Sequence, residues 1–266
     1  MMTDQSGYGK AGKKGPSGRS YRNATGLTRQ PKKMRGRRLS SQRWLTRQLN
    51  DPFVAEAKSR GFRSRAALKL EQMDDRFQLF KPGMAIVDLG CAPGGWLQVS
   101  SLRTKLGGSK ARLVGIDLLE TEDIVGADIF TGDITDPEML EKVQSAIGGA
   151  ADGVLSDMAA DTTGHRSTDH LRTTALLEAA LYFALDILNQ NGFFLAKCFR
   201  GGAEKSLLDM MQRNFKTVRH VKPAASRSES VESYVLAIGF HGIGKAEDIA
   251  ADVVAGKRDA DGMIIM

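Results

Sequence analysis

The chain of 266 residues has a net charge of +7, and its cysteines, Cys91 and Cys198, lack the spacing of a metal site. Because its four histidines are scattered as well, we expect neither a disulfide framework nor a metal centre. The sequence contains no apolar run near the roughly 18 residues of a membrane span and no apolar signal-peptide core at its start, so a cytoplasmic protein without a membrane partner is expected.

The first 50 residues differ in charge from the rest of the chain. They hold thirteen Lys or Arg and one acid, Asp4, which gives about +12, whereas residues 51–266 carry about −5. They are rich in Gly and Ser and lack apolar periodicity, so a disordered basic arm is predicted over 1–50. Such arms commonly contact nucleic acid, although a tail that only improves solubility is the simpler alternative.

Helix and strand patterns alternate from Asp51 onward. Residues 64–77 place apolar side chains every three to four positions, which predicts an amphipathic helix with Ser64 as a candidate N-cap. Further helices are predicted over 95–106, 136–147, 168–188 and 203–213, the third of these closed by the helix stop Asn191-Gly192. Strands are predicted over 84–90, 111–118, 127–134, 152–158, 191–200, 215–222 and 232–240.

This alternation is typical of an α/β fold with a mostly parallel sheet and helices on both faces. The last two strands have no helix between them, which predicts an antiparallel hairpin at the end of the sheet. We therefore expect one folded domain over 51–240, followed by a flexible tail over 241–266.

The segment VDLGCAPGGW (87–96) joins the first strand to a helix, the position at which doubly wound folds bind nucleotides. Its glycines fit the dinucleotide pattern GxGxxG poorly, and it lacks the GK[ST] of a P-loop. Asp88, Asp117 and Asp133 lie at the ends of three successive strands. Singly, each could be a turn or capping residue; together they favour a pocket for a nucleoside without phosphates, of which S-adenosylmethionine is the common example.

Lys197 interrupts the strand-like run NGFFLAKCFR (191–200), whose continuous apolar character indicates burial on both faces. Burial disfavours the charged form of a lysine. Either this side chain reaches water at the end of the strand, or the position uses an amine whose pKa is lowered for a function.

The motifs RSRAALKL, DLGCAPGGW, GIDLL, GDI, SDMA, AKCF and ESYVLAIG occur in this order over residues 51–240. In this respect the chain resembles the FtsJ/RlmE family of ribosomal RNA 2′-O-ribose methyltransferases. The resemblance implies the class I, Rossmann-like fold of S-adenosylmethionine-dependent methyltransferases, with a seven-stranded sheet whose last strand is antiparallel.

The resemblance also implies a catalytic tetrad and a cofactor site. The tetrad falls on Lys69, Asp157, Lys197 and Glu232, with Lys197 as the general base that takes the hydroxyl proton. The implied contacts to S-adenosylmethionine fall on Gly94, Trp96, Asp117, Asp133 and Asp157. The family usually has SDMAP with an asparagine soon after, whereas this chain reads SDMAADTTG, with Ala160 and Asp161 there. It also has Cys91 where alanine is common.

The substrate that the resemblance implies is a uridine ribose in the A-loop of 23S ribosomal RNA, on the large ribosomal subunit. A monomer is expected. Lys58, Arg60, Arg63 and Arg65 are predicted to extend a basic surface from the arm toward the tetrad. Transfer RNA or capped RNA is the main alternative substrate, because related enzymes share the tetrad. A non-catalytic RNA-binding assembly factor and a small-molecule O-methyltransferase remain as rival functions.

Overall fold

The structure is a computed structural model that describes residues 46, 48–160, 163–199, 205–227 and 230–242. The chain divides into two units, Met1–Ala55 and Glu56–Met266, and the sheet and its covering helices belong to the second. Most of the predicted arm and tail lie outside the described residues, so both remain predictions. Among the described helices, none combines the length and the apolarity needed to cross a bilayer.

From residue 64 onward the helices and strands follow the predicted order, whereas the helix α2 before it was not predicted. The helices are α2 (Pro52–Ser59), α3 (Ala66–Phe77), α4 (Gly95–Thr104), α5 (Pro137–Ile147), α6 (Arg166–Ile187) and α7 (Lys205–Asn214). The strands are β1 (Ala85–Leu89), β2 (Arg112–Asp117), β3 (Asp128–Thr131), β4 (Ala151–Ser156), β5 (Leu188–Phe199), β6 (Phe215–Val221) and β7 (Glu232–Phe240).

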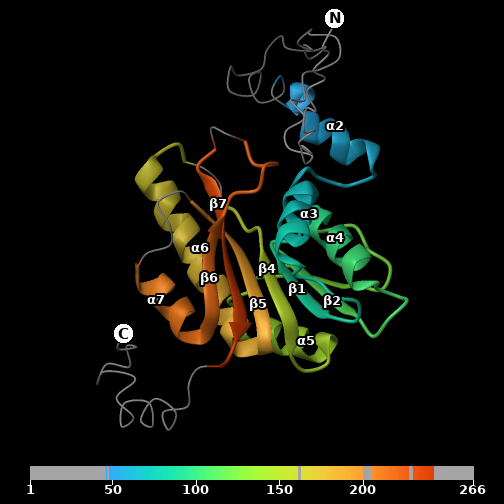
Figure 1. The fold of residues 1–266 in the computed structure, drawn as a ribbon, viewed down its shortest axis with the longest axis vertical. Coiled ribbons are helices and arrows are strands. Elements are labelled where there is room, and N and C mark those ends of the chain that lie inside the picture. Colours follow the sequence, from blue (N-terminus) through green and yellow to red (C-terminus); the bar gives the residue numbers. More distant parts are fainter. Residues whose placement is uncertain (1–45, 47, 161–162, 200–204, 228–229, 243–266) are drawn as a thin grey trace, which may run out of the picture. The chain divides into compact units, whose positions relative to one another are not determined.

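Seven strands form one sheet in the order β3-β2-β1-β4-β5-β7-β6 (Figure 1). The first five strands pair in parallel, whereas β7 is antiparallel to both of its neighbours. The last strand in the sequence is therefore inserted between β5 and β6. This confirms the predicted mostly parallel sheet with an antiparallel final strand and a terminal hairpin.

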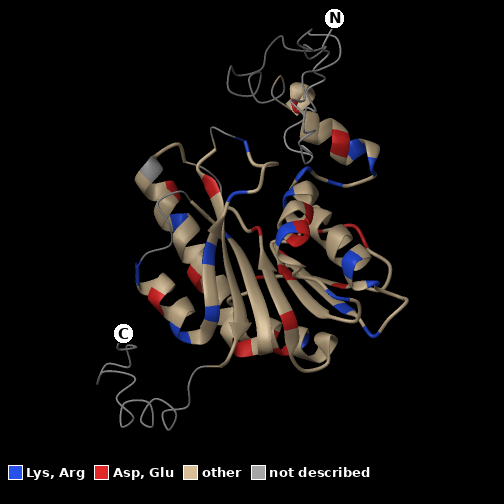
Figure 2. Ribbon diagram, in the orientation of Figure 1, with Lys and Arg blue, Asp and Glu red and all other residues tan. Residues whose placement is uncertain are grey.

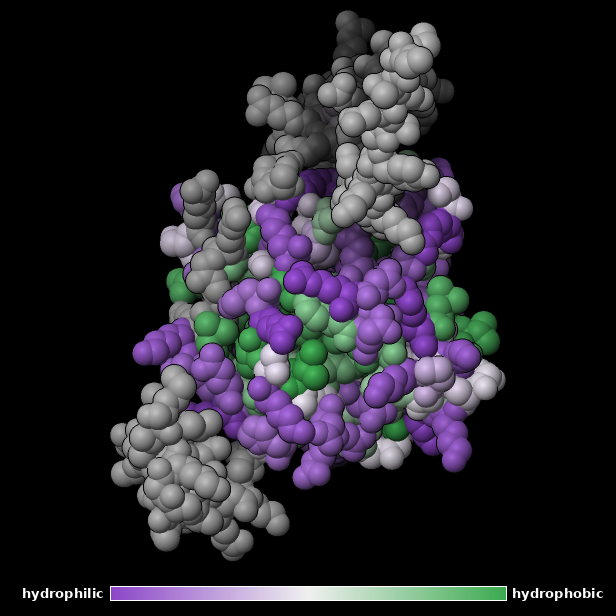
Figure 3. Space-filling view, in the orientation of Figure 1, coloured by the Kyte–Doolittle hydropathy of each residue, from purple (hydrophilic) through white to green (hydrophobic). Residues whose placement is uncertain are grey.

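Helices cover both faces of the sheet. Buried side chains of α3 and α4 pack on one face, and those of α5, α6 and α7 pack on the other. β1 alternates between the two cores, since Val87 and Leu89 belong to the α5–α7 side and Ile86 to the α3–α4 side. The space-filling view shows hydrophilic residues over most of one face of the molecule and hydrophobic ones gathered over the central strands (Figure 3).

Two local predictions are wrong. Helix α3 has Arg65, not Ser64, as its N-cap residue, without a side-chain capping bond. Helix α6 ends at Ile187, so Asn191-Gly192 does not terminate it but lies inside β5. Along the β4–β5 pair, Ala151 is opposite Leu188 while Gly153 is already opposite Phe193, and the extra residues bulge out. Asn191 adopts a left-handed φ of 64°, which asparagine tolerates in such bends.

The topology brings the predicted site residues to one edge of the sheet. β1, β2, β4 and β5 are parallel, so their carboxyl ends meet there. β7 begins at this edge, because Glu232 is opposite Phe199, the last residue of β5. In open α/β sheets this edge is where ligands bind.

Candidate active site

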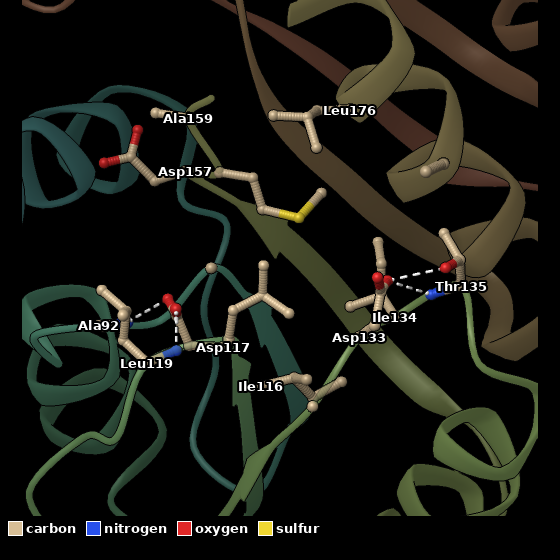
Figure 4. Close-up of a pocket in the computed structure, with 15 residues that line it drawn as sticks. Ala92, Ile116, Asp117, Leu119, Asp133, Ile134, Thr135, Asp157, Ala159 and Leu176 are labelled. Carbon is tan, nitrogen blue, oxygen red and sulfur yellow. Dashed lines mark hydrogen bonds between the residues drawn. The ribbon is translucent and has the colours of Figure 1, made fainter. Parts of the chain in front are cut away.

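A cavity of about 390 Å³ opens at the carboxyl edge of the sheet (Figure 4). Asp117, Asp133 and Asp157, three of the predicted site residues, line it. The rest of the wall is mostly apolar. Its larger side chains, which were not predicted from the sequence as part of a site, are Ile116, Leu118, Leu119, Ile134, Met158 and Leu176. The volume lies in the usual range for small-molecule sites, and the mixture of apolar walls with a few carboxylates is typical of them.

Hydrogen bonds, most of them from backbone N–H groups, hold two of these carboxylates in place. Asp117 accepts from the Ala92 N–H at 2.8 Å through one oxygen and from the Leu119 N–H at 2.9 Å through the other. Asp133 accepts from both the N–H and the hydroxyl of Thr135, and these bonds lower the pKa of Asp133. Figure 4 shows the two groups on opposite sides of the cavity. Each Asp117 oxygen keeps a second lone pair, and both bonds to Asp133 go to its Oδ1, so both carboxylates can accept further bonds from a ligand.

Asp88 does not line the cavity, contrary to the prediction that three strand-end acids share it. It is fully buried and shares the sheet face of Ile86, toward α3 and α4. Neither of its carboxylate oxygens has a hydrogen-bond partner among the described residues. Burial raises the pKa of Asp88 well above its ordinary value, and the nearby Asp157 and Asp117 add to the effect.

Gly94 and Trp96, the other two predicted cofactor contacts, lie in the first turn of α4 and are not part of the cavity lining. Gly94 is the N-cap of α4, with a φ of 102° that favours glycine. The Trp96 indole is 3% exposed and donates to the Ala66 carbonyl at 2.8 Å. What this turn offers a ligand is therefore backbone N–H groups, which lack intrahelical partners at a helix start.

The four predicted tetrad residues lie together, although they come from four different parts of the fold. One of them, Asp157, also lines the cavity. Lys69 lies on α3, Asp157 follows β4, Lys197 lies near the end of β5, and Glu232 begins β7. The Lys197 ammonium lies 2.9 Å from the Asp157 carboxylate and donates to the Asp157 carbonyl at 2.8 Å. Lys69 pairs with Glu232 at 3.2 Å, and Lys197 lies 3.9 Å from the other Glu232 oxygen. Both lysines are buried.

Tyr234 is a fifth member of this cluster that sequence reasoning missed. Its hydroxyl accepts from Lys69 at 3.1 Å and donates to Asp157 at 3.0 Å, so it links the two ion pairs. Tyr234 is opposite Lys197 in the β5–β7 register. The signal was present in the sequence, because Tyr234 lies two residues after Glu232 and alternation along a strand places both on one face.

The cluster sets the protonation of its own acids. Burial alone would raise the pKa of Glu232, but Lys69 and Lys197 outweigh it, and the pKa of Glu232 lies below its ordinary value. Burial raises the pKa of Tyr234 well above its ordinary range, helped by the charges of Asp157 and Glu232. The tyrosine hydroxyl therefore stays protonated and available as a donor to Asp157.

The arginines before α3 are already engaged within the fold. Arg60 forms a two-bond ion pair with Glu71, with both bonds at 2.7 Å. The guanidinium of Arg63 bonds to backbone carbonyls, and that of Arg65 donates to the Ala225 carbonyl. A basic surface built from these side chains and Lys58 stays a prediction.

The insertion of β7, the nucleoside-sized cavity and the adjoining lysine cluster together define a protein of the class I methyltransferase type. Comparison with known families agrees: the chain belongs to the FtsJ-like methyltransferase family, whose profile matches residues 62–240.

Proteins named ribosomal RNA large subunit methyltransferase E are among its relatives. The one from Paramagnetospirillum magneticum is 53% identical over 86% of this chain and 93% of its own length. The one from Bradyrhizobium diazoefficiens is 55% identical over 79% of this chain and 92% of its own length. Among solved structures, a protein described as a ribosomal RNA methyltransferase from Plasmodium falciparum is 29% identical with a TM-score of 0.62, covering 68% of this chain and all of its own.

Proposed function

We propose that the protein transfers the methyl group of S-adenosylmethionine to the ribose 2′-hydroxyl of a uridine in the A-loop of 23S ribosomal RNA, on the large ribosomal subunit. The observation that carries the proposal is the position of Asp157, which both lines the nucleoside-sized cavity and bonds to Lys197. A methyl donor in the cavity would thus lie next to a buried amine. The cytoplasm and a monomeric enzyme are the setting that this proposal implies.

The polar and apolar side chains that line the cavity suit the different parts of S-adenosylmethionine. Asp117 would accept bonds from the ribose hydroxyls, Asp133 would lie toward the adenine edge, and Ile116 and Ile134 would flank the base. The N–H group of Trp96, in the first turn of α4, suits a carboxylate, whereas that of Gly94 donates to the Cys91 carbonyl at 2.6 Å. Glycine is needed at position 90, because the backbone after β1 passes close to Met158, which follows β4. A Cβ at Gly90 would lie 2.6 Å from Met158 Cγ.

Lys197 is the residue that we expect to move the proton. When bound, S-adenosylmethionine supplies a methyl group on a sulfonium, which departs as a thioether once the methyl is transferred. A ribose hydroxyl is a weak nucleophile, so a base within hydrogen-bond reach is needed as the new O–C bond forms. A deprotonated Lys197 would accept the 2′-hydroxyl proton on Nζ and later release it to water.

The other cluster members orient this amine. Asp157 holds Lys197 through both its carboxylate and its carbonyl. Tyr234 fixes the same carboxylate from the other side, and Lys69 positions Glu232. A rigid arrangement of this kind keeps the base in line with the reacting oxygen, which is where much of an enzyme's advantage in a displacement arises.

An RNA substrate is supported by the hydroxyl and by charge. A ribose 2′-hydroxyl distinguishes RNA from DNA. Residues 205–227 contain six Lys or Arg and one acid, a net charge of about +5 within a chain that is otherwise acidic beyond residue 50. Figure 2 shows basic residues along β6, which forms one edge of the sheet, and at α7. The relatives named ribosomal RNA large subunit methyltransferase E favour ribosomal RNA over transfer RNA or a cap.

The proposal is tested by methyl transfer to large ribosomal subunits from cells that lack the endogenous enzyme. Radiolabelled S-adenosylmethionine reports incorporation, and mapping of the modified nucleotide reports the site. Lys197→Ala is assayed alongside, with Lys110→Ala, an exposed lysine before β2, as the matched control. We expect incorporation at one A-loop ribose, lost in Lys197→Ala and retained in Lys110→Ala.

Each other outcome has a defined meaning. Transfer to transfer RNA or capped RNA, but not to the subunit, would keep the reaction and replace the substrate. Binding of S-adenosylmethionine without transfer to any RNA would favour a non-catalytic assembly factor. Turnover that does not depend on added RNA would point to a small-molecule substrate.

A further inference from the structure

Residues 61–66, which lead into α3 and include its first residue, are hydrogen-bonded to the start of α4. Gln98 donates to the Gly61 carbonyl at 3.0 Å and accepts from the Arg63 N–H at 2.8 Å. Trp96 donates to the Ala66 carbonyl. The segment is thus attached to α4, the helix that follows the glycine-rich loop, residues 90–94.

The Arg63 side chain extends this attachment to a second loop. Its guanidinium donates to the Pro93 carbonyl at 3.3 Å, in the glycine-rich loop. It also donates to the carbonyls of Glu122 and Asp123 at 2.7 and 2.9 Å, in the loop that follows Asp117, Leu118 and Leu119. One side chain therefore connects the two loops that border the cavity on either side of Asp117.

The Arg63 side chain is largely buried and holds two loops together, rather than lying on the surface as a solvated cation. Its side chain is 19% exposed, and Glu122 lies 3.7 Å from the guanidinium. It also lies directly on Gly94, where a Cβ would be 2.4 Å from Arg63 Nη1. A planar guanidinium with several donors can hold diverging carbonyls, whereas a lysine offers a single point of charge.

We propose that Arg63 is a positioning residue for the cofactor site, which sets the affinity for S-adenosylmethionine by fixing the glycine-rich loop against the loop over residues 118–127. This reassigns Arg63 from the predicted RNA-binding surface to the cofactor side of the enzyme. The inference rests on the proposed use of S-adenosylmethionine. It needs no contact between Arg63 and the cofactor, because the side chain acts through the backbone that it holds.

The test compares Arg63→Gln, Arg63→Lys and the matched control Arg76→Gln, an exposed arginine on α3 whose guanidinium lies over the Phe77 ring. Calorimetry gives the dissociation constant of S-adenosylmethionine, and hydrogen exchange without cofactor gives the protection of amides 118–127. Steady-state kinetics separate the KM for S-adenosylmethionine from the KM for RNA. We expect Arg63→Gln to weaken cofactor binding roughly tenfold or more, to speed exchange in 118–127, and to leave the KM for RNA unchanged.

Arg63→Lys discriminates between a brace and a charge. If Arg63 acts by holding the two loops together, Arg63→Lys should not restore cofactor affinity. This variant also decides the question if Arg63→Gln does not fold. A raised KM for RNA that lysine rescues would overturn the proposal in favour of a phosphate contact, as would unchanged cofactor affinity in both variants. Wild-type protein that binds no S-adenosylmethionine would instead contradict the proposed function itself.

Discussion

The cavity and the lysine cluster share Asp157 but are held together in different ways. In the cavity, Asp117 and Asp133 are fixed by three backbone N–H groups and one hydroxyl, and three of these four bonds come from within two residues along the chain. In the cluster, the bonds join side chains that are far apart in sequence, such as Lys69 to Tyr234 and Asp157 to Lys197. The cavity is thus built by local turns, and the cluster by the tertiary fold.

This difference predicts how each region responds to change. A turn that makes its own hydrogen bonds keeps its shape when a distant side chain is replaced. A cluster of buried charges depends on every partner, because removing one leaves another buried without compensation. Variants in the cavity should therefore alter cofactor affinity, and variants in the cluster should alter catalysis or stability.

The largest effect is expected for Lys197→Ala. Loss of the base should lower the rate of methyl transfer by roughly 10²- to 10⁴-fold, the usual contribution of general base catalysis. Cofactor affinity should stay near wild type, because Lys197 does not line the cavity. Single-turnover transfer and calorimetry give the two quantities. A rate within a few-fold of wild type would remove Lys197 from the chemistry.

Asp117→Ala is the corresponding change in the cavity. It removes the acceptor for two backbone N–H groups and for a ligand hydroxyl, so affinity for S-adenosylmethionine should fall by roughly 10- to 100-fold. The maximal rate at saturating cofactor should change much less. Asp128→Asn, an exposed acid on β3, is the matched control for calorimetry. A normal dissociation constant together with a strongly reduced rate of methyl transfer would contradict the assignment of cofactor binding to the cavity and of catalysis to the cluster.

The same difference explains how much could be predicted from the sequence. The order of helices and strands, the parallel sheet and the acids Asp117 and Asp133 follow from local periodicity and from strand ends. The meeting of Lys69 with Glu232 depends on where α3 lies relative to β7, which no local pattern contains, so only the resemblance to a family pointed to it. Asp88 was misplaced because its side-chain direction depends on the pleat of β1, not on its position at a strand end.

Tyr234→Phe tests whether the cluster acts as one unit. It removes only the hydroxyl that links Lys69 to Asp157, both of which keep their ion-pair partners. We expect the free energy of unfolding to fall by roughly 1–3 kcal/mol, the usual cost of unsatisfied buried polar groups. Urea unfolding without cofactor measures it, with the half-exposed Tyr182→Phe as control. Equal stability of the two variants would mean that the tyrosine bridge is dispensable.

The smallest effect concerns pH, and it isolates Glu232. Because Lys69 and Lys197 overcome the effect of burial, the pKa of Glu232 is lower in the folded protein than its ordinary value of about 4.3. The unfolded chain then binds the proton more readily, so this carboxylate stabilises the fold above the unfolded pKa, and the contribution is lost as pH falls through the folded pKa.

Glu232→Gln should therefore differ from wild type by a constant amount in unfolding free energy above about pH 5, and the difference should shrink as the pH falls below 4. Glu120→Gln, which replaces an exposed acid, should follow the wild-type pH profile throughout. The side chain of Glu232 is one-third exposed, so solvent screening keeps the difference modest. A difference of the opposite sign, with Glu232→Gln more stable than wild type above about pH 5 and the two converging in acid, would mean that burial and not the two lysines dominates at Glu232.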